Sequence, residues 1–479
     1  MIKSPNLTKT NIYPSNHMST ICAPATASGG AMAVIRVSGP EAIAITSRIF
    51  SKDLSKANGY TLHYGWIKST GANAEIIDDV LVSVFRTPNS YTGEDSTEIS
   101  CHGSHYIVEK IMEALIQSGA RMAAPGEFTK RAFLAGKMDL SQAEAVADLI
   151  ASGNEATHRM ALSQMRGGFS HELEELRTQL LHLTSLLELE LDFSDHEDLE
   201  FADRKELTSL ANTIYNHVHR LTESFRTGNA LKRGIPVAII GAPNVGKSTL
   251  LNALVHEDRA IVSDIQGTTR DLIEDTIQID DITFRFIDTA GLRETSDRIE
   301  QLGIERSIQA AQKADIIILL TEPGKSFPEI STPPHSIILP VINKADLLSP
   351  ETALSAQTSA LQSTSSTATT IAQNPLYISS RTGSGLSELN SQLLSAAHKL
   401  LSPIDSDTTV VTNLRHYEAL LHAQEALLRT NQALSYNLPG DLIAEDLRQC
   451  LHFLAEITGG EITTPEVLSN IFKNFCIGK

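Results

Sequence analysis

The sequence contains few cysteines, and they are not arranged as a metal or disulfide motif. The four cysteines are Cys22, Cys101, Cys450 and Cys476, and no two of them form a CxxC pair. A disulfide framework and a zinc ribbon are therefore excluded, and the composition fits a reducing compartment.

Positive charge is also scarce. The 57 acidic residues outnumber the 39 basic residues, so the formal net charge is −18. A surface with this balance does not coat nucleic acid nonspecifically. Any contact with RNA must use a local basic patch or a partner.

Long apolar runs are absent as well. No stretch reaches the ~18 consecutive apolar residues that a membrane-spanning helix needs. Residues 1–18 lack the apolar core of a secretory signal and are expected to form a flexible leader. We expect a cytoplasmic protein that has no contact with a membrane.

Changes in hydrophobic periodicity divide the 479 residues into domains. Residues 19–136 mix short β-rich runs, at 31–37 and 80–85, with a helical run at 107–115, which predicts an α+β domain. Residues 137–230 and 401–479 have helical spacing and predict one helical domain. Its clearest signal is a stripe of leucines: Leu173, Leu176, Leu180, Leu183 and Leu187.

The intervening residues, 231–400, predict an α/β unit inserted into the helical domain. Five short β-rich runs alternate there with helix-length segments, which indicates a parallel sheet with crossover helices. These runs are residues 237–240, 283–287, 316–320, 337–342 and 376–378. A Ser/Thr/Ala-rich stretch at 349–374 is predicted to be a surface insertion.

One loop of the inserted unit has the sequence of a phosphate-binding site. Residues 241–248 read GAPNVGKS and lie between a predicted strand and a predicted helix. Glycines in such a loop let backbone N–H groups surround phosphates, while Lys247 reaches the β- and γ-phosphates and Ser248 binds Mg²⁺. The strand-to-helix context disfavours a chance match.

Three further motifs follow at the ends of predicted strands. Asp288 begins a DTAG sequence, where its carboxylate can hold Mg²⁺ through water and the N–H of Gly291 can sense a γ-phosphate. The NKAD sequence ends at Asp346, whose carboxylate can accept two hydrogen bonds from guanine but not from adenine. A third motif, SSR at 379–381, would close over the base. Together these motifs predict a GTPase.

The residues that act on the γ-phosphate are less clear from spacing alone. Thr268 and Thr269 are both candidates for a switch threonine that reaches Mg²⁺. Many small GTPases place a glutamine directly after DxxG to orient the attacking water, but this chain has Leu292 there. A charged residue between 293 and 300 must take that role, and spacing does not choose among them.

Distinctive strings outside the inserted unit identify a family. They read SYTGED at 90–95, CHG at 101–103 after Glu98, PGEFT at 125–129, RAFLAGK at 131–137 and FCIGK at 475–479. With the inserted GTPase, the chain from about Thr20 to Lys479 resembles the tRNA-modification GTPase MnmE (TrmE) family. It departs from the family in its leader, in the insertion at 349–374 and at Ser104, where a second glycine is common.

The resemblance implies an N-terminal domain that binds folate and forms a homodimer, a helical domain, and an inserted G domain with a Ras-like parallel sheet. It implies a heterotetramer with an FAD-dependent partner, MnmG (GidA). Together they would add a carboxymethylaminomethyl-type group to C5 of the wobble uridine of tRNA. A 5-formyl- or methylene-tetrahydrofolate would supply one carbon; the amino donor, whether ammonia, glycine or taurine-like, stays open.

The resemblance also implies site residues. Folate contacts match Arg36, Glu98, Lys137 and Lys479. Mg²⁺ would be held by Ser248 and Thr269, and K⁺ by Asn244, Ser263, Ile265 and Thr268. The GTP-binding set is Asn244, Val245, Gly246, Lys247, Ser248, Thr249, Ser263, Asp264, Ile265, Gln266, Gly267, Thr268, Thr269, Asp288, Thr289, Ala290, Gly291, Asn343, Lys344, Ala345, Asp346, Ser379, Ser380 and Arg381.

Two more residues are implied to act in catalysis. Glu300 matches the water-positioning glutamate of the family, which answers the question that Leu292 raises. Cys476 matches a cysteine important for modification, as nucleophile, acid or structural contact. G domains of a dimer would meet face to face and activate hydrolysis.

His102, His105 and His158 lack metal-ligand spacing and are expected to be structural.

Two other GTPase classes would carry features after the G domain that can be sought in this sequence. A ribosome-assembly GTPase would carry a basic RNA-binding module with a GxxG loop after the G domain. A dynamin-type GTPase would carry a basic amphipathic or apolar membrane segment. Residues 401–479 show helical spacing and neither feature.

Overall fold

The computed structural model describes most of the chain, in two compact units. The described residues are 19–27, 29–71, 74–192, 204–257, 275–280, 282–287, 309–328, 330, 332–333, 336–348, 375–401, 409–436, 438–460, 468, 471–473, 475 and 478. One unit comprises Met1–Ile150, Gln164–His171 and Ala455–Lys479, and the other comprises Ala151–Ser163 and Glu172–Leu454. The predicted leader and the insertion at 349–374 lie outside the described residues. The finer domain boundaries at 137, 231 and 401 stay a prediction.

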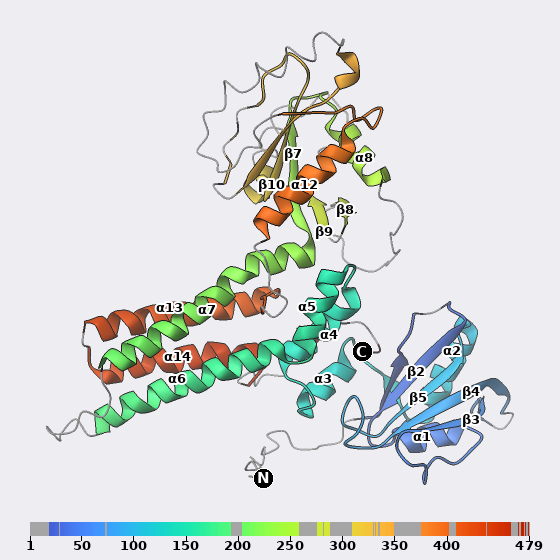
Figure 1. Ribbon diagram of the computed structural model, residues 1–479. Coiled ribbons are helices and arrows are strands. Elements are labelled where there is room, and N and C mark those ends of the chain that lie inside the picture. Colours follow the sequence, from blue (N-terminus) through green and yellow to red (C-terminus); the bar gives the residue numbers. More distant parts are fainter. Residues whose placement is uncertain are drawn as a thin grey trace. The chain divides into compact units, whose positions relative to one another are not determined.

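The first unit is built on a six-stranded sheet (Figure 1). Its order is β3-β4-β5-β2-β1-β6, antiparallel except between β1 and β6. The strands are β1 (Ile21–Pro24), β2 (Met32–Ser38), β3 (Thr61–Lys68), β4 (Ile76–Phe85), β5 (Ser96–His102) and β6 (Arg121–Met122). The strands predicted at 31–37 and 80–85 are thus confirmed.

Helices α1 (Ala42–Ile49) and α2 (His105–Gln117) pack on one face of this sheet. Every second side chain along the strands points to this face, and those of Ile35, Val82 and Ile99 are buried there. Because side chains alternate along a strand, Arg36 and Glu98 lie on the opposite face.

The end of the chain packs in the same unit. Helix α4 (Leu140–Ala151) contributes Leu140 to an apolar cluster with Phe472, and Phe133 of α3 (Glu127–Leu134) packs against this cluster. At Gly478, which has φ 94°, an added Cβ would collide with the carbonyl oxygen of Pro24 at the end of β1. Gly478 therefore lies against the end of the first strand, and only glycine fits there.

The helices of the second unit bury the predicted leucine stripe. Leu173, Leu176, Leu180, Leu183 and Leu187 are all buried on α6 (Gly168–Asp192). The other long helices are α7 (Arg204–Arg233), α13 (Leu414–Ser435) and α14 (Gly440–Thr458), and α5 is Glu155–Met165. The rings of Phe225 on α7 and Tyr417 on α13 stack with centroids 4.2 Å apart. Helical spacing thus indicated the correct buried faces.

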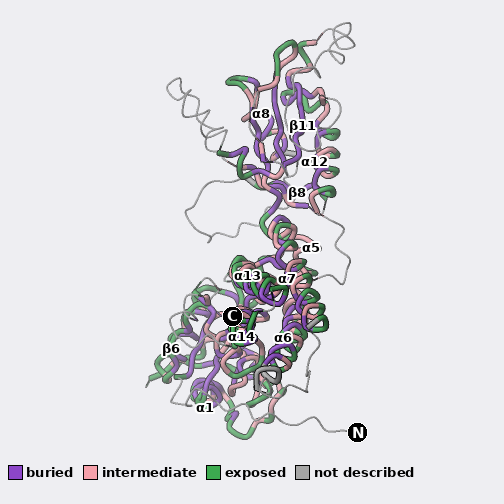
Figure 2. The backbone as a smooth tube through the Cα atoms, turned by 90° about the vertical axis from the view of Figure 1, so that its left-hand side faces the viewer, coloured by how far each residue is buried: buried purple, intermediate pink, exposed green. Residues whose placement is uncertain are grey.

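The second unit also contains a six-stranded sheet of order β12-β11-β10-β7-β9-β8. Its strands are β7 (Ile235–Gly241), β8 (Asp275–Ile279), β9 (Ile282–Phe286), β10 (Ile316–Thr321), β11 (Ile337–Ile342) and β12 (Leu376–Tyr377), with helices α8 (Lys247–Glu257) and α12 (Leu386–Leu400). Strands β10 and β11 are buried at every residue (Figure 2), as expected for a parallel sheet covered on both faces.

One strand departs from the predicted parallel sheet. Strand β8 pairs antiparallel with β9, whereas the other pairs are parallel. Two residues separate these strands, and the first of them, Asp280, has the positive φ, 50°, that is common in tight hairpin turns. Strand β8 therefore forms an antiparallel edge of the sheet, and the β-rich runs of the sequence did not predict this strand.

Two contacts join the helices of this unit to its sheet. The guanidinium of Arg226 on α7 lies 2.8 Å from the carboxylate of Asp315, directly before β10. The side-chain amide of Asn154, directly before α5, donates to the hydroxyl of Thr283 on β9 at 3.3 Å. Gly234, with φ 86°, is the only residue between α7 and β7.

In the described part of the chain, no helix is both long and apolar enough to cross a membrane.

Candidate functional site: three loops at the carboxyl edge of a sheet

The predicted phosphate loop connects β7 to α8, as its sequence requires. Gly246 has φ 97°, and a Cβ there would strike the side chain of Asn343. The ammonium of Lys247 donates to the carbonyls of Gly241 at 2.9 Å and Ala242 at 3.1 Å. Burial lowers the pKa of Lys247. A phosphate at this helix N-terminus would meet both backbone N–H groups and this cation.

Asn343 joins the phosphate loop to a second and a third loop. This side chain is buried, its amide nitrogen donates to the Val245 carbonyl at 2.8 Å, and its amide oxygen accepts from the Ser380 N–H at 3.0 Å and hydroxyl at 2.9 Å. The asparagine of the NKAD motif therefore holds the phosphate loop and the loop at 379–381 together. Sequence reasoning placed it among GTP contacts but could not show this role.

Asp346 is the group of this motif that is available to a base. It is exposed, and one of its carboxylate oxygens accepts from the Ser379 hydroxyl at 2.6 Å. This hydrogen bond, opposed by partial desolvation and aided by Arg381 and Lys344, lowers the pKa of Asp346. The carboxylate stays ionised at neutral pH and keeps an oriented acceptor for two N–H donors.

Several predicted site residues lie outside the described residues. They are Ser263, Asp264, Ile265, Gln266, Gly267, Thr268, Thr269, Asp288, Thr289, Ala290, Gly291, Glu300, Cys476 and Lys479. Of the predicted cation ligands, the described ones are Ser248 and Asn244, which offer a hydroxyl and a neutral amide oxygen. Such oxygens suit Mg²⁺ and a monovalent cation respectively. Among the described residues no group of three or more His, Cys, Asp or Glu side chains could hold a metal ion.

The first unit holds three of the four predicted folate residues near one loop. Arg36 and Glu98 are directly paired across β2 and β5, with the Arg36 Nε 2.9 Å from a carboxylate oxygen. The Arg36 guanidinium also lies 5.2 Å from the ring centroid of Tyr91. Carbons of Lys137 lie 3.5 and 3.7 Å from the position of a Cβ added at Gly93. Arg36 and Lys137 therefore border the loop at residues 90–95, and Glu98 is joined to it through Arg36.

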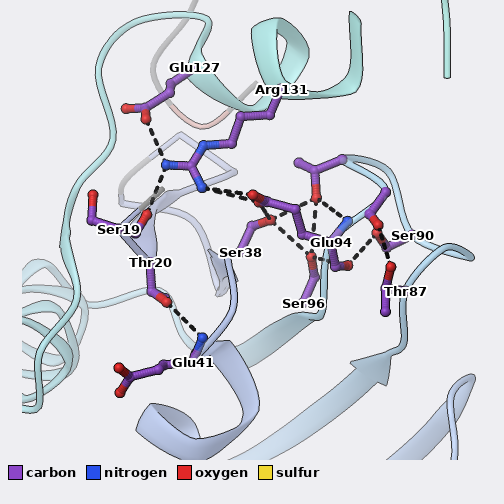
Figure 3. A network of polar contacts seen from close by, with 12 residues as sticks. Ser19, Thr20, Ser38, Glu41, Thr87, Ser90, Glu94, Ser96, Glu127 and Arg131 are labelled. Carbon is purple, nitrogen blue, oxygen red and sulfur yellow. Dashed lines mark hydrogen bonds and ion pairs between the residues drawn. The ribbon is translucent and has the colours of Figure 1, made fainter. Parts of the chain in front are cut away.

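A buried arginine holds this loop in place (Figure 3). The guanidinium of Arg131 on α3 contacts both oxygens of Glu94 at 3.1 Å, the carboxylate of Glu127 at 2.9 Å and the Ser19 carbonyl at 2.9 Å. Glu94 also accepts from the Ser38 hydroxyl on β2 at 2.8 Å. The strings at 90–95, 125–129 and 131–137 contain this arginine and both glutamates, but they do not reveal the network, because its partners are far apart in sequence.

The network stabilises the ionised form of Glu127. Burial opposes ionisation of this carboxyl, but hydrogen bonds from Arg121, the Ala124 N–H and Arg131 outweigh it and lower its pKa to about 2. Breaking one partner of a buried pair costs ~3–5 kcal/mol because a buried charge is left uncompensated. The network thus anchors α3, and with it Lys137, to the sheet.

One of the three histidines expected to be structural lies at the end of a strand, beside a carboxylate. The ring Nδ1 of His102, at the end of β5, lies 2.7 Å from an Asp78 oxygen, and the other Asp78 oxygen accepts from the His102 backbone N–H at 2.8 Å. His102 is thus partnered by a carboxylate, which is compatible with a structural role.

The second unit has the arrangement of a P-loop nucleotide-binding protein, with a strand, phosphate loop and helix beside the NKAD and SSR loops. The family described as "MnmE helical domain" matches residues 140–476, and that described as "GTP-binding protein TrmE N-terminus" matches residues 20–137. The chain belongs to the tRNA modification GTPase MnmE family, and the resemblance inferred from the sequence is confirmed.

Curated relatives match along nearly the whole chain. The tRNA modification GTPases MnmE of Bacteroides thetaiotaomicron and Parabacteroides distasonis are 54% and 55% identical, over 96% of this chain and 99% and 100% of theirs. That of Flavobacterium johnsoniae is 49% identical over 96% of this chain and 99% of its own. Among solved structures, Era of Aquifex aeolicus is 24% identical, over 40% of this chain and 66% of its own, with a TM-score of 0.23.

Changing the base-reading carboxylate should change the preferred base. Asp346→Asn replaces an acceptor of two hydrogen bonds by an amide that can donate, and xanthine carries a carbonyl where guanine carries its 2-amino group. GDP affinity should fall by ~10-fold or more because its donors lose an ionised acceptor, while affinity for xanthosine diphosphate should rise. Competition titrations of the two nucleotides measure this. Equal losses for both nucleotides would contradict base reading by Asp346.

Proposed function

We propose that this chain hydrolyses GTP and, in the cytoplasm with the FAD-dependent partner MnmG (GidA), adds a carboxymethylaminomethyl-type group to C5 of the wobble uridine of tRNA. The observation that carries the proposal is the match to tRNA modification GTPases over 96% of the chain. The joined phosphate and base-reading loops support the GTPase part of the proposal.

For hydrolysis, the described residues supply binding and orientation. Lys247 and the N–H groups at the start of α8 would hold the phosphates, and Asp346 the base. Mg²⁺ would be held by Ser248 and Thr269, and K⁺ by Asn244, Ser263, Ile265 and Thr268. Bound cations would offset the charge that develops on the phosphates. Glu300 would orient the attacking water, since Leu292 cannot.

For modification, the first unit would bind the one-carbon donor. Arg36 and Lys137 are cations suited to the glutamate carboxylates of a tetrahydrofolate, while Glu98 can accept from a pterin amine. The contact of Gly478 with Pro24 supports a place for the C-terminal residues beside this sheet. Cys476 and Lys479 would then act at the folate site.

A homodimer through the N-terminal domain has support in the same sheet. Strand β3 is at its edge, and Leu62, Tyr64 and Trp66 project from one face of it with 60%, 61% and 45% of their surface exposed. An aromatic and apolar row of this kind is typical of an interface. Dimerisation would let two G domains meet and activate each other.

The cation proposal predicts a salt preference. Wild-type GTP hydrolysis should be faster in K⁺ than in Na⁺ at equal ionic strength, because Asn244 offers a neutral oxygen beside the phosphates. Asn244→Ala should abolish the preference, whereas Asn252→Ala, an exposed asparagine on α8, should keep it. Phosphate release measures both. Equal wild-type rates in the two salts would refute the assignment.

The folate proposal predicts a loss of ligand affinity on removal of one charge. Arg36→Met should weaken binding of 5-formyltetrahydrofolate by ~10-fold or more, since a charge-assisted pair is lost. Arg48→Met is the matched control, because Arg48 lies on α1 and pairs with Glu41 at the surface. Titration calorimetry on the full chain gives both affinities. Unchanged binding by Arg36→Met would exclude Arg36 from the site.

The C-terminal proposal predicts that the two activities separate. Deleting residues 476–479 should leave K⁺-stimulated GTP hydrolysis close to normal and abolish wobble-uridine modification, because the GTP motifs lie within residues 241–381. Cys476→Ser should do most of the same. Phosphate release and nucleoside mass spectrometry of cellular tRNA test the pair. Full modification would refute the role of the tail, and loss of both activities would show that it supports the fold.

A further inference from the structure

Glu322 connects two lysines beside the nucleotide loops. It follows β10 directly, and its side chain is 18% exposed. One carboxylate oxygen contacts the ammonium of Lys344 in the NKAD motif, and the other lies 2.8 Å from the ammonium of Lys325. Hydrogen bonds from Lys325 and Lys344 lower the pKa of Glu322 to about 2, so the carboxylate is ionised at neutral pH.

Lys344 makes a second contact that reaches the phosphate loop. Its ammonium donates to the backbone carbonyl of Asn244 at 2.8 Å. Since an ammonium has three donors, Glu322 and Asn244 together leave one for a ligand. One lysine therefore bridges the carboxylate at the end of β10 and the loop that receives phosphates.

The backbone at both ends of this bridge is in an unusual conformation. Asn244 has φ 63° and Lys344 has φ 59°, in the left-handed region that residues other than glycine rarely adopt. Such conformations persist only where surrounding contacts hold them. The hydrogen bond from Lys344 to the Asn244 carbonyl is a contact of this kind.

The position of Glu322 itself is fixed by the sheet. The hydroxyl of Thr321, the last residue of β10, donates to the Ser326 carbonyl at 3.1 Å, and the Lys325 N–H donates to the Glu322 carbonyl at 3.1 Å. A tight turn thus holds the carboxylate at the strand end. By contrast, the side chain of Lys325 is 64% exposed, so solvent screens its ion pair with Glu322 and the pair adds little to stability.

We propose that Glu322 is a positioning residue for guanine nucleotides, acting through Lys344 to hold the Asn244 carbonyl and keep the phosphate loop shaped for its ligand. Glu322 touches neither base nor phosphate. Its negative charge keeps the Lys344 ammonium at the loop instead of in water. The inference rests on the proposed binding of GTP.

The test is nucleotide binding by the full chain with Glu322→Gln, which keeps the shape of the side chain and removes its charge. GDP should dissociate roughly tenfold faster, an effect of the size found between groups in direct contact. The rate of GTP hydrolysis at saturating GTP should change less than the Michaelis constant. Lys325→Met, which removes the other and more exposed partner, should behave like the wild type.

A double-mutant cycle separates positioning from general destabilisation. In a Lys344→Met background, Glu322→Gln should have no further effect on GDP dissociation, because the group through which it acts is gone. Glu322→Asp should restore part of the affinity. Thermal unfolding of the nucleotide-free variants, followed by circular dichroism, should match the wild type.

The outcomes distinguish this inference from the proposed function. Failure of the wild type to bind GDP would refute the GTP-binding proposal itself. Wild-type binding together with an unchanged GDP dissociation rate in Glu322→Gln would overturn the role of Glu322. Additive effects of the Glu322 and Lys344 substitutions would do so as well, since they would show that the two residues act independently.

Discussion

The nucleotide site depends on one buried side chain amide, that of Asn343. Its nitrogen is bonded to the phosphate loop and its oxygen to the loop after β12. A buried amide without these partners would cost free energy, so the three loops are held together as a set. Lys344 and Asp346, the next polar residues of the motif, can then act at their own positions: Lys344 on the Asn244 carbonyl, and Asp346 where a guanine base would lie.

The sheet makes this arrangement possible because its strands are parallel. Strands β7, β10, β11 and β12 run in the same direction, so the loops that follow their carboxyl ends meet at one edge. The antiparallel strand β8 extends the sheet beyond β9, away from these loops in the strand order. It therefore does not disturb the edge that would receive the nucleotide.

A different interaction organises the first unit. Arg131 is almost wholly buried and is balanced by Glu94 and Glu127, which joins α3 to the loop at 90–95. The Arg36–Glu98 pair lies on the neighbouring strands β2 and β5. Charged groups thus serve two purposes here. Arg131 pairs with groups of the protein and stabilises the fold. Arg36 and Lys137 border the loop and are proposed to bind a ligand.

The sequence by itself determined the phosphate loop, the base-reading motif, the leucine stripe of α6 and the family. These are local patterns, in which a strand, a glycine-rich turn or a helix face is specified by residues close together in the chain. Only the tertiary structure decided that Asn343 connects Val245 to Ser380, that Arg131 joins Glu94 and Glu127, and that Glu322 reaches Lys344. Glu322 and Lys344 are far apart along the chain, as are Glu94 and Arg131. Each pair comes into contact only when the strands pair and pack. No spacing rule indicates such pairs, because their geometry follows from the sheet order and from the need to compensate buried charge.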